Sequence, residues 1–303
     1  MRPAADSQGR PRRLLHFTNV APYRDTGTRM ETLSRPSREV RCRTLLVGAL
    51  IVLLTGCVST GLSGVQRSLS ETTWGYQHVE DPHPVFLGKM SQRFEVRPGD
   101  CSSDTGWSDC ETDRERSEVT AESAKFYPGS DKWVSFMLYL PKDFKTSPFV
   151  NATLGQIHMQ GGFSGFAGGF KSFPPLLQLN ARGNSYTACF HVLSGDEGDI
   201  NDKCHNKKIT SIANMKGRWS RVTLYFAAQS KKPAVDIFFN GKKVAHFEQS
   251  LPKDPLYYYL KYGIYRSFVS RHGGPMPTQV AYYDEVKVGA SREEAENEKQ
   301  ILD

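Results

Sequence analysis

The chain has 303 residues, of which 38% are hydrophobic and 23% charged, a composition typical of globular rather than disordered or fibrous proteins. No run of about 18 or more apolar residues occurs, which argues against a membrane-spanning protein. Residues 1–56 hold 10 Arg and 4 acidic residues, so they carry most of the formal net charge of +7. The remainder is nearly neutral, and a general nucleic-acid-binding role is therefore not supported.

The N-terminal part has the pattern of an export signal. Several arginines precede an apolar run from Leu45 to Leu54, and small residues then lead to Cys57. The ending Leu-Thr-Gly-Cys resembles the bacterial lipobox, in which the cysteine is lipidated. We therefore expect residues 1–56 to be an extension and lipoprotein signal peptide, and Cys57 to anchor the protein in the bacterial cell envelope, in the periplasm or at the outer-membrane surface. An uncleaved signal anchor is the alternative, and Met30 is a second candidate start.

Export also implies an oxidising compartment, where cysteines form disulfides. Besides the leader cysteine and Cys57, four remain: Cys101, Cys110, Cys189 and Cys204. Local pairing, Cys101 with Cys110 and Cys189 with Cys204, has the lowest loop-closure cost of the three connectivities. A zinc site is the rival interpretation, but the chain lacks a Cys-x2-Cys knuckle.

Short segments of strand type dominate the exported part. Residues 57–75 are rich in Ser, Thr and Gly and indicate a tether. We expect the folded domain at residues 76–290 and a helical tail at 291–303. Strands are predicted at 132–140, 219–227, 235–239, 242–247 and 281–288, with a hairpin turn at Asn240-Gly241. Many strands and almost no helix predict an all-β, two-sheet antiparallel sandwich, with residues 161–175 as a Gly- and Phe-rich loop over one face.

Three segments combine one apolar and one polar face, because strand side chains alternate between the two sides of a sheet. The polar faces carry the following side chains: Arg114, Arg116 and Glu118; Gln156, His158 and Gln160; and Tyr259, Lys261 and Tyr265. A single polar strand face is usually solvated surface, so each segment alone indicates little.

Together the three segments are more specific. Arg-Ser-Glu-Val at 116–119, Gln-Ile-His at 156–158 and Tyr-Leu-Lys-Tyr-Gly-Ile-Tyr at 259–265 resemble the signature regions of the jelly-roll alginate lyases and their heparin-lyase-like relatives, in the same chain order. The resemblance covers roughly residues 85–290 and implies a concanavalin A-like jelly roll. The chain departs from the alginate enzymes at Thr120 and Ser267, where they often have Arg and Gln, so the identity of the sugar stays open.

The resemblance implies a lyase that removes the C5 proton of a uronic acid and expels the C4 oxygen. Gln156 and Arg116 would hold the carboxyl group while negative charge develops on it. His158 would be a neutral base or a further neutralising group. Tyr265 would give its proton to the leaving oxygen, and it could also be the base if Lys261 and Arg116 lower its pKa.

The expected substrate-binding residues are Arg114, Glu118, Gln160, Tyr259, Lys261 and Arg266. No nucleic acid is expected as a partner, and the protein is expected to be a monomer held to the membrane by its lipid. No cofactor is expected, although an acidic loop with Asp196, Glu197, Asp199 and Asp202 leaves calcium open.

Two other functions remain as alternatives. A non-catalytic carbohydrate-binding lipoprotein could keep the same fold, and a glycoside hydrolase could use the acids of the segment from Glu111 to Glu115. Several residues are not assigned to the site: His191, His205, His246 and His272. Trp107 and Tyr127 are candidates for stacking on sugar rings, although core packing is the commoner role of an aromatic side chain.

Overall fold

The computed structural model describes residues 62–69, 71–104, 107–161, 174–194, 201–249, 251–253 and 255–296. The predicted leader, Cys57 with its predicted lipid, most of the loop at 161–175 and three of the four acidic residues near 200 lie outside these residues. Within them, no helix is both long enough and apolar enough to cross a membrane.

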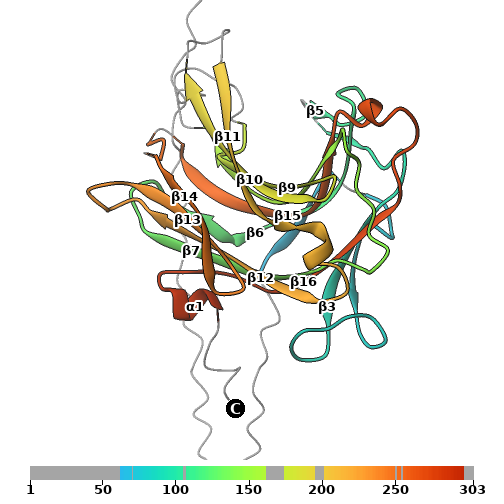
Figure 1. Cartoon of the computed structure of the whole chain (residues 1–303), viewed down its shortest axis with the longest axis horizontal. Helices are drawn as coiled ribbons and strands as arrows, with labels where there is room; N and C mark the ends of the chain where they lie inside the picture. The colour runs from blue at the N-terminus through green and yellow to red at the C-terminus, as the bar shows by residue number, and fades with distance from the viewer. Residues whose placement is uncertain are drawn as a thin grey trace, which may run out of the picture. The chain divides into compact units, whose positions relative to one another are not determined.

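The described part is a sandwich of two antiparallel seven-stranded sheets (Figure 1), which confirms the predicted fold class. Sheet A has the order β1-β6-β15-β8-β9-β10-β11, and Figure 1 shows it curving so that its outer face is concave. Its strands are β1 Val65–Ser68, β6 Arg114–Phe126, β8 Asn151–Gln160, β9 Leu177–Arg182, β10 Ser185–Ser194, β11 Asn201–Ser211 and β15 Tyr257–Ser267.

Sheet B has the order β14-β13-β12-β7-β16-β3-β2. Its strands are β2 Tyr76–Val79, β3 Ser91–Val96, β7 Lys132–Tyr139, β12 Trp219–Ala227, β13 Ala234–Phe239, β14 Lys242–Glu248 and β16 Gln279–Gly289. The remaining described elements are the small pair β4 Ser103–Asp104 and β5 Trp107–Ser108, the 3-10 turns Ile212–Asn214 and Val269–His272, and α1 Arg292–Glu296.

The core between the sheets follows from side-chain alternation. On β15, Leu260, Tyr262 and Ile264 are fully buried toward sheet B, where Tyr262 packs against Phe94 and Tyr283. Burying a large apolar side chain contributes about 1.5–3 kcal/mol, so this layer holds the sandwich together. The intervening residues of β15 necessarily point to the outer face of sheet A.

A bulge in β15 sets where the end of this strand points. The register with β8 shifts between Lys261 and Tyr265, and Gly263 lies within the shifted stretch at φ 127°. A Cβ at this position would lie 2.3 Å from the carbonyl oxygen of Ser117, so only glycine fits. The glycine of the third sequence motif therefore has a structural reason.

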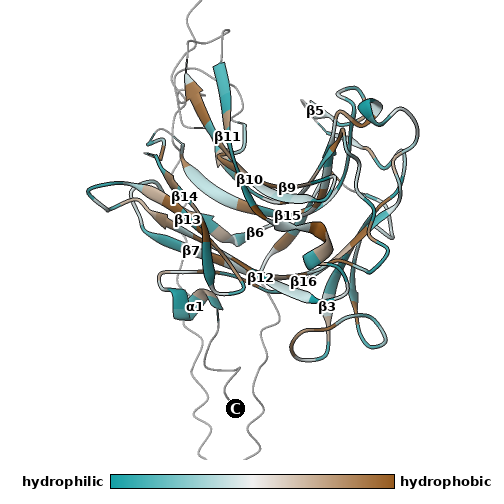
Figure 2. Ribbon diagram, viewed as in Figure 1, coloured by the Kyte–Doolittle hydropathy of each residue, from teal (hydrophilic) through white to brown (hydrophobic). Residues whose placement is uncertain are grey.

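Both predicted disulfides are present, Cys101–Cys110 and Cys189–Cys204. The predicted tether was wrong in part, because residues 65–68 form β1 and pair with residues 118–121 of β6. The predicted helical tail contains α1, which is mostly hydrophilic in Figure 2 and buries only Ala295 and Glu296.

Candidate active site

The three sequence motifs meet on the outer face of sheet A, as their alternation predicted. On the β6–β15 ladder Arg116 lies opposite Tyr265, and on the β15–β8 ladder Gln156 lies opposite Lys261 and His158 opposite Tyr259. We call this surface the polar face, and it comprises Arg116, Glu118, Gln156, His158, Tyr259, Lys261 and Tyr265. Segments more than 100 residues apart in the sequence thus supply one site.

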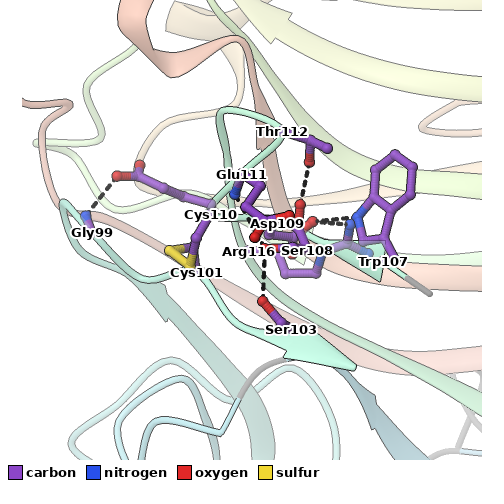
Figure 3. The surroundings of a disulfide bond; sticks show 11 residues. Gly99, Cys101, Ser103, Trp107, Ser108, Asp109, Cys110, Glu111, Thr112 and Arg116 are labelled. Carbon is purple, nitrogen blue, oxygen red and sulfur yellow. Dashed lines mark hydrogen bonds and ion pairs between the residues drawn. A yellow bond between two sulfur atoms is a disulfide. The ribbon is translucent and has the colours of Figure 1, made fainter. Parts of the chain in front are cut away.

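Arg116 is buried in a network of its own. Its Nε and Nη2 donate to the two carboxylate oxygens of Asp109 at 2.5 and 2.6 Å (Figure 3), and its Nη1 lies 3.5 Å from Glu118. Burial alone would lower the pKa of Arg116, but the charges of Glu118 and Asp109 outweigh it and raise the pKa. The guanidinium is therefore a fixed cation, and the two donors that bind Asp109 are not open to a substrate in this arrangement.

The ring of Tyr265 packs against the guanidinium of Arg116. The guanidinium carbon of Arg116 lies 4.5 Å from the centre of the phenol ring, and the Nε of Arg114 donates to the phenol oxygen at 2.7 Å. Burial raises the pKa of Tyr265, and this effect exceeds the lowering by Arg116 and Arg114. The expectation of a lowered pKa was thus wrong, because burial outweighs the nearby cations. Tyr265 is thus a phenol whose oxygen accepts from Arg114.

Lys261 is the most unusual residue of the polar face. Its side chain is only 9% exposed, yet no carboxylate of the described residues lies within ion-pair distance of its ammonium group. Burial lowers the pKa of Lys261, with the charge of Glu118 acting in the opposite direction. Since burying an uncompensated charge is costly, such a cation is typical of a site that receives an anion.

His158 is held as a neutral imidazole. Its Nδ1 lies 3.1 Å from both the backbone nitrogen and the carbonyl oxygen of Met159, and its Nε2 has no hydrogen-bond partner among the described residues. Burial, together with the charge of Lys261, lowers the pKa of His158 to about 3. The ring lies beside that of Tyr259, whose pKa is raised to about 12 by burial. Five ladder steps on β8, about 16 Å, separate the strand positions of His158 and Tyr265, with Gln156 and Lys261 between them.

A chain of hydrogen bonds fixes the orientation of the Gln156 amide. A carboxylate can only accept, so the Gln156 amide must turn its Nε2 toward Glu118, to which it donates at 2.8 Å. The Oε1 of Gln156 then faces Gln178 and accepts from its Nε2 at 3.5 Å. Gln178 in turn presents its Oε1 to His191 at 3.1 Å, and His191 Nδ1 faces Asp202 at 2.9 Å. Within the described part of the chain Glu118 is the one acceptor for the Gln156 amide, so its second N–H is open to a ligand there.

Sequence reasoning missed Asp109 and Gln178, left His191 outside the site, and named Asp202 only as part of the acidic loop that left calcium open. Asp109, Gln178 and Asp202 carry no motif. They are placed by the Cys101–Cys110 loop, β9 and β11, respectively. One signal was available for Gln178 and His191. They lie on the neighbouring strands β9 and β10, and side-chain alternation turns both of them outward.

Some predicted site residues lie elsewhere. Arg266 was expected to bind substrate, but it is fully buried on the core side, ion-paired with Glu115 and bonded to the carbonyl of Arg97. Because Tyr265 points outward, its neighbour on the strand must point inward. Gln160 is exposed at the far end of β8, and Thr120 donates to the carbonyl of Leu260 at 3.1 Å.

The acids of the hydrolase alternative do not form a pair of facing catalytic groups. Glu111 is exposed, while Asp113 holds the backbone and hydroxyl of Ser270 at 3.0 and 2.6 Å. Glu115 points to the core side, where it pairs with Arg266. These three carboxylates are therefore not arranged as a general acid and a nucleophile.

Among the described residues, no group of three or more His, Cys, Asp or Glu side chains could hold a metal ion. Of the acidic loop that left calcium open, only Asp202 lies within the described part, and it faces His191.

Asp109 gives a direct test of the buried ion pair. We expect Asp109→Ala to lower the free energy of unfolding by about 3 kcal/mol, since it leaves Arg116 with Glu118 as its remaining anionic partner. Glu122→Ala is the matched control: Glu122 is 72% exposed and pairs with Lys125, so its loss should cost less than about 1 kcal/mol. Denaturant unfolding measures both, and equal effects would contradict this account of Asp109.

Comparison with known proteins identifies the class. The family model for polysaccharide lyases matches residues 60–287, so the chain belongs to the polysaccharide lyase family. No curated protein sequence matches the chain.

Solved structures share the fold. An endo-β-1,4-glucuronan lyase from the fungus Trichoderma reesei is 19% identical with a TM-score of 0.59, and the match covers 78% of this chain and 93% of that chain. A family 7 alginate lyase, A1-II', in complex with substrate is 13% identical with a TM-score of 0.50, covering 75% of this chain and 93% of that chain. The protein is thus a polysaccharide lyase with the jelly-roll fold of these enzymes.

Proposed function

We propose that the protein cleaves an anionic polysaccharide containing uronic acid by β-elimination. The observation that supports this most is Lys261, a buried cation without an ion-pair partner in the described part of the chain, flanked by a neutral imidazole and a phenol. A site for simple binding of a neutral sugar would have no need of such an uncompensated charge.

In this proposal the uronate carboxylate sits over Lys261 and the free N–H of Gln156. Removal of the C5 proton places a second negative charge on the carboxyl group, and these donors stabilise it as it develops. Gln156 is oriented before substrate arrives by its hydrogen bonds with Glu118 and Gln178. Arg116 acts as a positioning residue that supports the ring of Tyr265.

We assign the proton transfers to His158 and Tyr265. His158 Nε2 takes the C5 proton in the neutral tautomer whose Nδ1–H donates to the carbonyl oxygen of Met159, because Nε2 then carries the free lone pair. Tyr265 gives its phenolic proton to the C4 oxygen as the C4–O bond breaks, while the C5–H electron pair forms the C4–C5 double bond. This division suits a uronate whose C5 proton and C4 oxygen lie on opposite faces of the ring. If they lie on one face, Tyr265 would serve both steps.

Ultraviolet absorbance of the unsaturated product tests the proposed reaction. The protein would be incubated with alginate, glucuronan and heparin-type chains, and we expect absorbance to rise with at least one of them. Binding to these polymers without any rise in absorbance would favour the alternative of a carbohydrate-binding protein.

We further propose that the enzyme is exported and held in the cell envelope by a lipid on Cys57. The basic residues, apolar run and Leu-Thr-Gly-Cys ending of the sequence support this. Cells supplied with a labelled fatty acid should label the protein and lose the label with Cys57→Ser. A labelled Cys57→Ser protein would contradict the anchor.

A further inference from the structure

Two exposed aromatic rings lie next to the Tyr265 end of the polar face. Trp107 and Phe268 are each 41% exposed, although large apolar side chains are usually buried. Both rings face the guanidinium of Arg114, whose central carbon lies 5.3 Å from the centre of Trp107 and 4.9 Å from that of Phe268. Arg114 also donates to the phenol oxygen of Tyr265 at 2.7 Å, which joins the rings to the site.

Trp107 is held in place by the buried network. Its indole Nε1 donates to Asp109 Oδ1 at 2.9 Å (Figure 3), and the same oxygen accepts from Arg116 Nη2 at 2.6 Å. The Cys101–Cys110 disulfide closes the loop that carries this tryptophan. An exposed ring that is fixed by a hydrogen bond to a buried carboxylate is a preformed contact surface rather than an incidental one.

The backbone at Phe268 has an unfavourable conformation, which hydrogen bonds to Asp113 maintain. Its φ of 59° is left-handed, a region that is unfavourable for a non-glycine residue. The carbonyl of Asp113, itself left-handed at φ 63°, accepts from the N–H groups of Phe268 and Val269 at 2.8 and 3.2 Å. These hydrogen bonds to Asp113 keep the Phe268 ring at the surface. The guanidinium carbon of Arg271 lies 4.3 Å from the centre of the ring.

We propose that Trp107, Phe268, Arg114 and Arg271 form a binding subsite for the sugar on the leaving-group side of the cleaved bond. This inference rests on the proposed function. Aromatic rings bind the apolar C–H face of a pyranose, and the two guanidiniums complement the carboxylate of a uronic acid. The leaving oxygen belongs to the glycosidic bond at Tyr265, so the sugar beyond it reaches the residues that surround Arg114.

Equilibrium binding tests the subsite separately from catalysis. Guluronate and glucuronate oligosaccharides would be titrated into the full-length protein carrying Tyr265→Phe, and the heat of binding would be measured by titration calorimetry. We expect Trp107→Ala to weaken binding about tenfold or more and Trp107→Phe, which keeps a ring, to retain much of the affinity. In the otherwise unchanged enzyme, Trp107→Ala should raise KM more than it lowers kcat.

Trp133→Phe is the matched control. Trp133 stacks on Tyr225 at 4.3 Å in sheet B, away from the polar face, so its replacement should leave the affinity unchanged. Affinity that is equal in Trp107→Ala and the parent, or lost equally in Trp133→Phe, would overturn the subsite while leaving the proposed lyase reaction intact. Failure of the unsubstituted enzyme to produce an unsaturated product from any uronate polymer would instead overturn the proposed function.

Discussion

Tyr265→Phe is expected to lower kcat by about a hundredfold to ten-thousandfold, the usual contribution of a general acid. The substitution removes one oxygen and keeps the ring that packs on Arg116. Without the phenol the leaving oxygen departs as an alkoxide, and Arg114 loses its acceptor on Tyr265. Steady-state rates of ultraviolet absorbance increase on the cleaved polymer measure the effect.

Tyr262→Phe is the control for this substitution. It makes the same chemical change on the same strand, but the side chain is fully buried on the core face of sheet A. We expect its activity to stay within a fewfold of the unsubstituted enzyme. Near-normal activity of Tyr265→Phe would remove the phenol from the mechanism.

His158→Ala is expected to lower kcat/KM by a similar factor, since it removes the base. His246→Ala is its control, because His246 is exposed on β14 and pairs with Asp236 in sheet B. A loss confined to His158→Ala would support the assignment. Full activity in that variant would assign the C5 proton to Tyr265 instead.

The pH dependence follows from the same two groups. The pKa of His158 is lowered to about 3 by burial and by the charges of Lys261, Arg116 and His191, so the imidazole stays unprotonated as pH falls through 6.5. We therefore expect kcat/KM to hold its plateau well below pH 6. Burial raises the pKa of Tyr265, so the phenol stays protonated to higher pH than an ordinary tyrosine, which extends the plateau on the alkaline side. A kcat/KM that rises steadily toward high pH would indicate a tyrosinate base.

Alternation and spacing in the sequence were enough to predict which side chains share the polar face. A strand has only two sides, so Arg116, Gln156 and Lys261 could be oriented without knowing the sheet order. The same rule could have excluded Arg266, which follows the outward-facing Tyr265 and must point to the core. The motif resemblance then indicated which strands are neighbours.

The remaining features depend on contacts between distant segments. Asp109 reaches Arg116 because the Cys101–Cys110 loop folds against the start of β6, and no local pattern encodes that approach. The protonation of Tyr265 depends on the balance between burial and two arginines, which a sequence does not give. The region 57–75 was misread because its Ser- and Thr-rich composition conceals β1 at the edge of sheet A.

The chemistry of bond cleavage can be read from the mass of the products formed in water enriched in heavy oxygen. If the polar face carries out an elimination, each cut leaves a new chain end with a double bond, lacking the mass of one water and carrying no heavy oxygen from the solvent. Uptake of one heavy oxygen atom at every cleaved bond would mean hydrolysis, and would contradict the roles assigned to Lys261, His158 and Tyr265.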